Sequence, residues 1–142
     1  MNQNIEVLNA VYQNAQMAID SIETLSKKVT DSNFRNDLHE QRKRYSEFAN
    51  MAVEELEKYG ARADDISTMS KLGLNASINM NMMMNNHTGH LAEMMIQGTN
   101  MGVIELKKCI NHLDDVDAPV AKLCMDMHEF ERRNIDSLKN YL

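Results

Sequence analysis

The chain has 142 residues and a formal net charge of −6, and 43% of its residues are hydrophobic. This length suits one domain with a buried core, and the acidic balance argues against binding to nucleic acid or to an anionic membrane surface. No apolar run approaches the roughly 18 residues of a membrane-spanning helix, so we expect no membrane span. Five glycines, one proline and few aromatic residues favour helices over sheet.

The first half of the chain predicts two long antiparallel helices. Apolar residues recur every three or four positions over about 3–29 and again over about 34–59. The TDSN segment between them supplies a break and an N-cap, and Gly60 is placed to end the second helix. Helices of this length with so short a join must pack as antiparallel neighbours.

The second half predicts a weaker helix followed by two stronger ones. Residues 67–86 have a helical pattern but contain several asparagines, and HTG at 87–89 marks either a break or a kink. Two amphipathic helices follow, over about 90–113 and 119–142, and Asp117 is a cap for the last of them.

The spacing of these elements predicts the fold class. The joins within each pair of strong helices are short, whereas a long segment separates the pairs. A helix of about 19 residues spans roughly 28 Å, which is about the distance needed to return along a bundle. We therefore predict a single all-α domain over 1–142, a four-helix bundle in which 67–86 is a long helical crossover.

An internal repeat relates the two predicted hairpins. QNAQMAIDSI (13–22) aligns with QGTNMGVIEL (97–106), and HEQRKRY (39–45) aligns with HEFERRN (128–134). The matches occur in the same order on equivalent helices, so we expect two related halves. The second copy also carries a stripe of small residues that we interpret as a close helix–helix contact, Gly98 and Gly102.

With these features the chain resembles the ferritin-like superfamily, in particular small bacterial ferritin-like families of uncharacterised function. The resemblance covers essentially the whole chain and includes the stretches LNAVYQNAQMAIDSI and HLAEMMIQGTNMGVIEL. It implies a ferritin-like bundle with the crossover between the second and third helices. Metal-active relatives, such as rubrerythrin-like proteins, place a Glu on the first and third helices and a Glu-x-x-His on the second and fourth, and these side chains hold two irons.

This sequence departs from that ligand pattern, because it contains no Glu-x-x-His. The positions that align with the ligands carry amides, a tyrosine or cations in place of most carboxylates and histidines. They are Gln16, Asn100 or Gln97, Arg42-x-x-Tyr45 or Glu40-x-x-Lys43, and Glu131-x-x-Asn134. An amide brings no negative charge to offset a dication, so we do not expect an intact di-iron centre.

Two interpretations of these interior polar residues stay open. The favoured one is a buried hydrogen-bond network, because buried polar groups must find partners inside the protein. Its members would be Gln16, Gln41, Tyr45, Asn100 and Asn134. The alternative is an atypical interior site for iron or manganese, lined by Gln16, Asn100, Glu105, Glu131 and Asn134.

The segment NMNMMMNNHTGH (79–90) raises a separate metal hypothesis. Thioether and imidazole groups are ligands for Cu(I), and they recur here at helical spacing. The copper candidates are Met80, Met83, Met84, His87 and His90. The favoured alternative is packing, because methionine fills irregular gaps on helices that lie against a bundle.

Location and function are predicted from what the sequence lacks. The N-terminal stretch has no basic region followed by an apolar one, so we expect a cytoplasmic protein in which Cys109 and Cys124 are reduced and able to face each other. No nucleophile–base constellation or phosphate-binding loop is visible, which gives no motif for an enzyme. We therefore expect a binding or association module, with a homodimer or another protein as partner. An atypical iron, manganese or copper protein with a redox role is the alternative.

Overall fold

The computed structural model describes residues 2–63 and 87–142, and within them it is helical without any strand. All four long helices predicted from the sequence are present. They are α1 (Gln3–Ser26), α2 (Ser32–Lys58), α4 (Thr88–Ile110) and α5 (Ala118–Leu138), followed by the short 3-10 helix η1 (Lys139–Tyr141). The predicted crossover, 67–86, lies outside the described residues.

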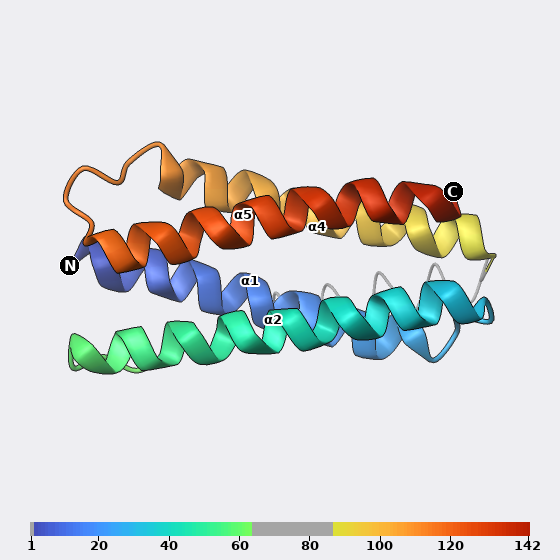
Figure 1. The fold of residues 1–142 in the computed structure, drawn as a ribbon, viewed down its shortest axis with the longest axis horizontal. Coiled ribbons are helices and arrows are strands. Elements are labelled where there is room, and N and C mark those ends of the chain that lie inside the picture. Colours follow the sequence, from blue (N-terminus) through green and yellow to red (C-terminus); the bar gives the residue numbers. More distant parts are fainter. Residues whose placement is uncertain (1, 64–86) are drawn as a thin grey trace.

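The four helices form two hairpins that pack side by side (Figure 1). α1 packs against α2, and α4 packs against α5. α1 also contacts both α4 and α5, and α5 contacts α2. α2 and α4 run in the same direction, so the chain leaves α2 at the end of the bundle opposite to the start of α4 (Figure 1). A chain that returns to start a parallel helix needs a long connection.

The turn after α1 and the end of α2 follow from local sequence signals. The Asp31 side chain accepts a hydrogen bond from the backbone N–H of Phe34 at 2.9 Å, which caps α2. Gly60, just beyond α2, has a φ of +68°, a conformation that residues with a Cβ rarely adopt. Both features were predicted from the sequence.

The start of α5 is fixed by contacts with the first hairpin. Asp117 is the N-cap residue, but its carboxylate accepts a hydrogen bond from the Tyr59 hydroxyl and does not cap its own helix. Its backbone N–H donates to Asn4 Oδ1 at 2.7 Å. These bonds join the N-terminus of α5 to α1 and to the residue that follows α2.

The core is aliphatic and aromatic along the whole bundle. Its largest fully buried side chains come from all four helices: Leu8, Ile22, Leu25, Phe34, Leu38, Tyr45, Phe48, Leu56, Leu91, Leu106, Met127 and Leu138. Of the described methionines, Met95 and Met127 are buried, whereas Met101 is 64% exposed. Methionine therefore serves both as core filler and as exposed apolar surface.

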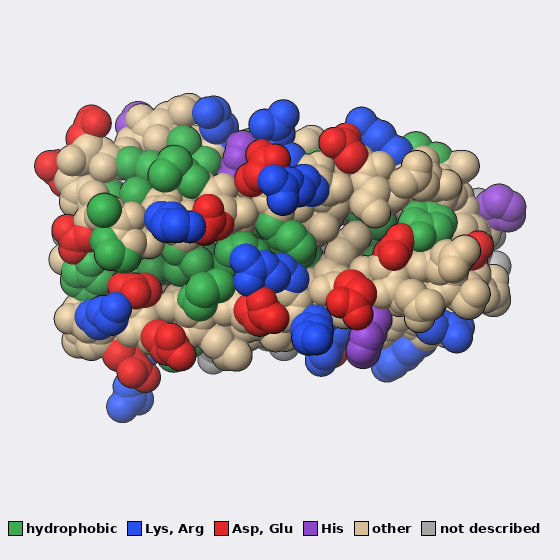
Figure 2. Space-filling model, in the orientation of Figure 1, with side chains coloured by type: hydrophobic (Ala, Val, Ile, Leu, Met, Phe, Trp, Pro, Cys, Tyr) green, Lys and Arg blue, Asp and Glu red, His purple; other side chains and the backbone are tan. Residues whose placement is uncertain are grey.

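The visible surface carries charges of both signs (Figure 2). Hydrophobic side chains gather on it toward the end of the bundle where α2 ends and α5 begins. None of the helices in the described ranges combines the length and the hydropathy needed to cross a membrane.

Candidate functional site

The least expected feature of the interior is a buried carboxylate on α5. The buried residues of α5 recur every three or four positions, and Glu131 takes one place in this otherwise largely apolar stripe. Its side chain is only 2% exposed. The fold thus carries an acidic group into a level of the bundle where it has almost no contact with solvent.

Two polar side chains surround this carboxylate. The Tyr45 hydroxyl of α2 donates to Glu131 Oε2 at 2.9 Å, and Asn134 Nδ2 donates to the Tyr45 oxygen at 3.4 Å. The other carboxylate oxygen, Oε1, is buried and has no hydrogen-bond partner. Such an unmatched acceptor is uncommon in folded proteins and calls for an explanation.

Burial determines the protonation of this cluster. It raises the pKa of Glu131 from 4.5 to about 8, although the hydrogen bond from Tyr45 lowers it in part. Burial also raises the pKa of Tyr45 well above its ordinary 10, and the neighbouring Glu131 adds to this effect. At neutral pH most molecules therefore hold a protonated Glu131 and a neutral Tyr45.

A glycine on α4 makes room for the carboxylate. A Cβ atom built at Gly102 would lie 2.8 Å from both oxygens of Glu131. At Gly98, one turn earlier on the same helix, an added Cβ would meet nothing within 4 Å. The prediction that Gly98 and Gly102 form a close contact between two helices is therefore wrong. Gly102 contacts a side chain of α5, and Gly98 is exposed.

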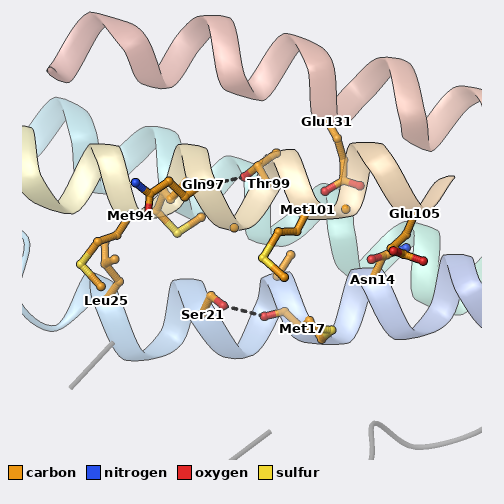
Figure 3. A pocket seen from close by; sticks show the side chains of 14 residues that line it. Asn14, Met17, Ser21, Leu25, Met94, Gln97, Thr99, Met101, Glu105 and Glu131 are labelled. Atoms are coloured by element: carbon orange, nitrogen blue, oxygen red, sulfur yellow. Dashed lines mark hydrogen bonds between the residues drawn. The ribbon is translucent and has the colours of Figure 1, made fainter. Parts of the chain in front are cut away.

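A groove lies between α1 and α4, with Glu131 among its lining residues (Figure 3). Its volume is about 250 Å³. Much of the lining is thioether and aliphatic, from Met17, Ala18 and Leu25 of α1 and from Met94, Met95 and Met101 of α4. We call this feature the α1–α4 groove.

The hydroxyl groups in the α1–α4 groove are already engaged. Ser21 Oγ donates to the Met17 carbonyl at 2.8 Å, and Thr99 Oγ1 donates to the Met95 carbonyl at 2.7 Å (Figure 3). Each bond lies within its own helix, so neither hydroxyl is held as a nucleophile beside a base. Among the lining residues, Glu131 is the buried group with an unused acceptor.

The structure separates the five residues predicted to line an interior metal site. Glu131 and Asn134 are buried, and both contact Tyr45. Gln16 is half-buried, whereas Asn100 and Glu105 are exposed, which is the opposite of the interior position predicted for them. Glu105 forms a surface ion pair with Lys108 at 3.0 Å.

The physical reason is the rotation of α4. The spacing of apolar and small residues predicts a buried seam on this helix of Leu91, Met94, Gly98, Met101, Glu105, Cys109 and His112. Leu91 is buried as predicted, but from Met94 to Glu105 the buried residues lie one position later along the chain. The buried residues of α4 are Leu91, Ala92, Met95, Thr99, Gly102 and Leu106. Small and polar side chains therefore face the core, and the more conspicuous methionine stripe borders the α1–α4 groove.

The predicted hydrogen-bond network is present in part. Tyr45 and Asn134 are buried and hydrogen-bonded to each other, whereas Gln41 is buried but its Oε1 has no partner. Gln16 is half-buried and Asn100 is exposed. Glu131, which the sequence offered only as a metal candidate, is the group that Tyr45 contacts directly. Its spacing with Asn134 was visible in the sequence, but the space left by Gly102 on another helix was not.

The donor set does not fit a di-iron centre. Nowhere in residues 2–63 or 87–142 do three or more His, Cys, Asp or Glu side chains come together as metal ligands. Glu131 is hydrogen-bonded to a neutral tyrosine, which in turn accepts from an amide, and neither group supplies a negative charge to offset a dication.

Most of the candidate copper ligands lie in the part of the chain that the structure does not describe. Met80, Met83 and Met84 lie outside the described residues. His87 is the N-cap of α4, and its Nδ1 accepts from the Gly89 N–H at 3.3 Å, while His90 is partly exposed. HTG therefore marks the start of α4, and copper binding stays a prediction.

Cys109 and Cys124 face each other between α4 and α5, and both are free thiols. The contact with Cys124 lowers the pKa of Cys109, whereas the same contact and burial raise the pKa of Cys124. The Cys124 thiol is also 3.9 Å from the Leu106 carbonyl oxygen. The predicted juxtaposition of the two cysteines is confirmed.

Comparison with known proteins supports the fold alone. No protein-family model matches the chain, and no curated protein matches its sequence. The chain is similar in structure to YcfI from Rhodopseudomonas palustris, a protein provisionally described as structural, with a TM-score of 0.76. The likeness covers 98% of this chain and 94% of YcfI, at 8% sequence identity. At 8% identity, the likeness shows only that the two proteins have a similar arrangement of helices.

Proposed function

We propose that the chain is a ferritin-like bundle that acts as a binding module, and that the α1–α4 groove receives the ligand. Two hairpins with parallel α2 and α4 support the ferritin-like assignment, since this arrangement needs a long crossover. The observation that carries the binding role is Glu131 Oε1, a buried and unpartnered acceptor on a residue that lines the groove.

Stability alone does not account for a glutamate at this position. An unmatched buried acceptor costs about 1–3 kcal/mol, and an apolar side chain of similar size would avoid this cost. Perturbed and unmatched groups of this kind concentrate at sites that bind or react. Because no nucleophile–base pair lies beside Glu131 in the described part of the groove, binding is the role that the geometry favours.

An uncharged apolar probe tests this proposal. In ¹⁵N NMR titrations with 1-hexanol, we expect saturable shifts of the amides of Ser21, Gly98 and Gly102. The variant Ala18→Phe, which fills the groove, should abolish them. Ala10→Phe places the same side chain at another half-buried position of α1 outside the groove and serves as control. Shifts that are absent, or that survive Ala18→Phe, would exclude the groove as the binding site.

Metal content provides a second, independent test. We expect less than about 0.1 iron or manganese per chain in protein purified without a metal-chelating tag from supplemented cells, because the interior donors lack the charge that these ions require. Stoichiometric iron or manganese would contradict the proposal and favour the metal or redox alternative. Self-association, or a protein partner, stays a prediction that sedimentation velocity can test.

A further inference from the structure

The charged residues that line the α1–α4 groove are both acidic. They are Glu105 and Glu131, and the described lining contains no lysine, arginine or histidine. Glu105 is exposed and paired with Lys108 on the surface. Glu131 has no cationic partner, so its negative charge, when present, is not offset by the protein. The charge distribution therefore favours a cation as the occupant.

The position of the free oxygen limits the shape of that cation. Oε2 of Glu131 receives the Tyr45 hydroxyl, which leaves Oε1 to accept one further donor. Both oxygens lie in the space that a Cβ of residue 102 would need, so the glycine lets the carboxylate reach the part of α4 that lines the groove. A single N–H group at the end of a ligand would satisfy Oε1, whereas a hydrated metal ion would need several oxygen ligands.

The rest of the groove suits an apolar body. Met17, Leu25, Met95 and Met101 contribute thioether and aliphatic surface, and thioether side chains adapt to varied shapes. The volume of about 250 Å³ is within reach of a small organic molecule and far below that of a folded domain. The groove thus matches a small molecule and not a folded partner.

We infer that the α1–α4 groove binds a small organic ammonium ion, whose N–H donates to Glu131 Oε1 while its apolar part lies among the methionines. This inference rests on the proposed binding function and assigns its ligand class. Glu131 is the anchoring residue, and Gly102 makes room for its carboxylate beside the groove.

The charge of Glu131 makes this binding dependent on pH. The titratable groups near it are Tyr45 from α2, which stays neutral, and Glu105 from α4, which is paired at the surface. α1 lines the groove with Asn14, Met17 and other uncharged side chains. Because the pKa of Glu131 is about 8, affinity for a cation should rise about tenfold per pH unit up to pH 8 and then level off.

The test compares hexylamine with 1-hexanol, which share an apolar chain and differ in charge. By ¹⁵N NMR titration at pH 9, we expect a dissociation constant on the order of 1 mM for hexylammonium and at least tenfold weaker binding of 1-hexanol. At pH 7 the ammonium should bind about tenfold more weakly, with 1-hexanol unchanged. Glu131→Gln should remove both the preference and the pH dependence. Glu54→Gln, an exposed carboxylate on α2 far from the groove lining, is the matched control.

The outcomes separate the two proposals. Equal binding of both probes at both pH values would overturn the ammonium assignment and leave the binding function in place. Failure of both probes to bind would overturn both. The comparison in the unaltered protein needs no variant, so it decides the matter even if Glu131→Gln does not fold.

Discussion

The two hairpins are built on related sequences, but they place opposite charges at one equivalent position. In the alignment of HEQRKRY with HEFERRN, Arg42 of α2 corresponds to Glu131 of α5. Arg42 lies at the surface, where its Nε donates to Glu23 at 3.2 Å. Glu131 lies inside the bundle, with one oxygen unpartnered. The same helical position is a solvated ion pair in one half and a buried acid in the other.

The difference is accommodated by a change on the facing helix. Ala18 of α1 corresponds to Gly102 of α4, and it is at Gly102 that the missing methyl makes room for the carboxylate. Tyr45 and Asn134 also occupy equivalent positions, and they hydrogen-bond to each other across the two halves. Both hairpins thus contribute a polar residue to this level, but only the second contributes a buried carboxylate.

The largest effect should come from removing that titratable group. Because the pKa of Glu131 is about 8 in the folded protein and 4.5 as the ordinary value, the folded state binds this proton more tightly than the unfolded state. The stabilisation is therefore complete below pH 4.5 and is lost as the pH rises through 8, a loss of roughly 5 kcal/mol. Glu131→Gln should match the unaltered protein near pH 4.5 and be more stable by several kcal/mol at pH 9.

Urea unfolding of both proteins from pH 4.5 to pH 9 measures this difference. Subtracting the two curves removes the contribution of every other titrating group that the variant leaves unchanged. Glu54→Gln, at an exposed position, should give a nearly flat difference. A flat difference for Glu131→Gln as well would mean that the carboxylate is solvated.

Tyr45→Phe should have the next largest effect. It removes the donor to Glu131 and the acceptor for Asn134, and leaving buried polar groups unmatched costs roughly 1–3 kcal/mol. Because the Tyr45 hydrogen bond lowers the pKa of Glu131, its loss should move that pKa higher. Carboxyl-carbon NMR titration and urea unfolding measure the two effects. Tyr12→Phe on α1, at a half-buried position, is the control and should change stability by less than about 0.5 kcal/mol.

Alanine substitutions at two glycines of α4 should change the stability of the protein in opposite directions. Gly102→Ala places a methyl group 2.8 Å from both Glu131 oxygens, so the carboxylate must move and weaken its bond to Tyr45. We expect a net loss of about 1–2 kcal/mol. Gly98→Ala meets no neighbour and should stabilise the helix by up to about 1 kcal/mol. Thermal unfolding of both variants measures the contrast, and shifts of equal sign would show that Glu131 does not constrain position 102.

These positions also show how far the sequence could predict the molecule. The helices and the signals at Asp31 and Gly60 are local, so the pattern of residues was enough to place them. The buried face of α4 was misplaced by one residue, because its methionine stripe looks more apolar than the true seam through Thr99 and Gly102. A glycine is needed in that seam because the Glu131 carboxylate of another helix takes up the space at Gly102. No local pattern contains this information.

The smallest effect should come from the equivalent position of the first hairpin. Arg42 and Glu23 are 41% and 48% exposed, so water and salt screen their attraction. Arg42→Gln should change the free energy of unfolding by less than about 1 kcal/mol, with no change in slope between pH 6 and pH 9. The measurement is the same urea series used for Glu131→Gln, repeated at low and high salt. A large or pH-dependent effect would show that the first hairpin also holds a buried charge at this level, and the functional asymmetry between the halves would then disappear. A small, salt-sensitive effect would mean that this level of the bundle holds a buried charge in the α4–α5 half alone, where the carboxylate and the glycine facing it occur together.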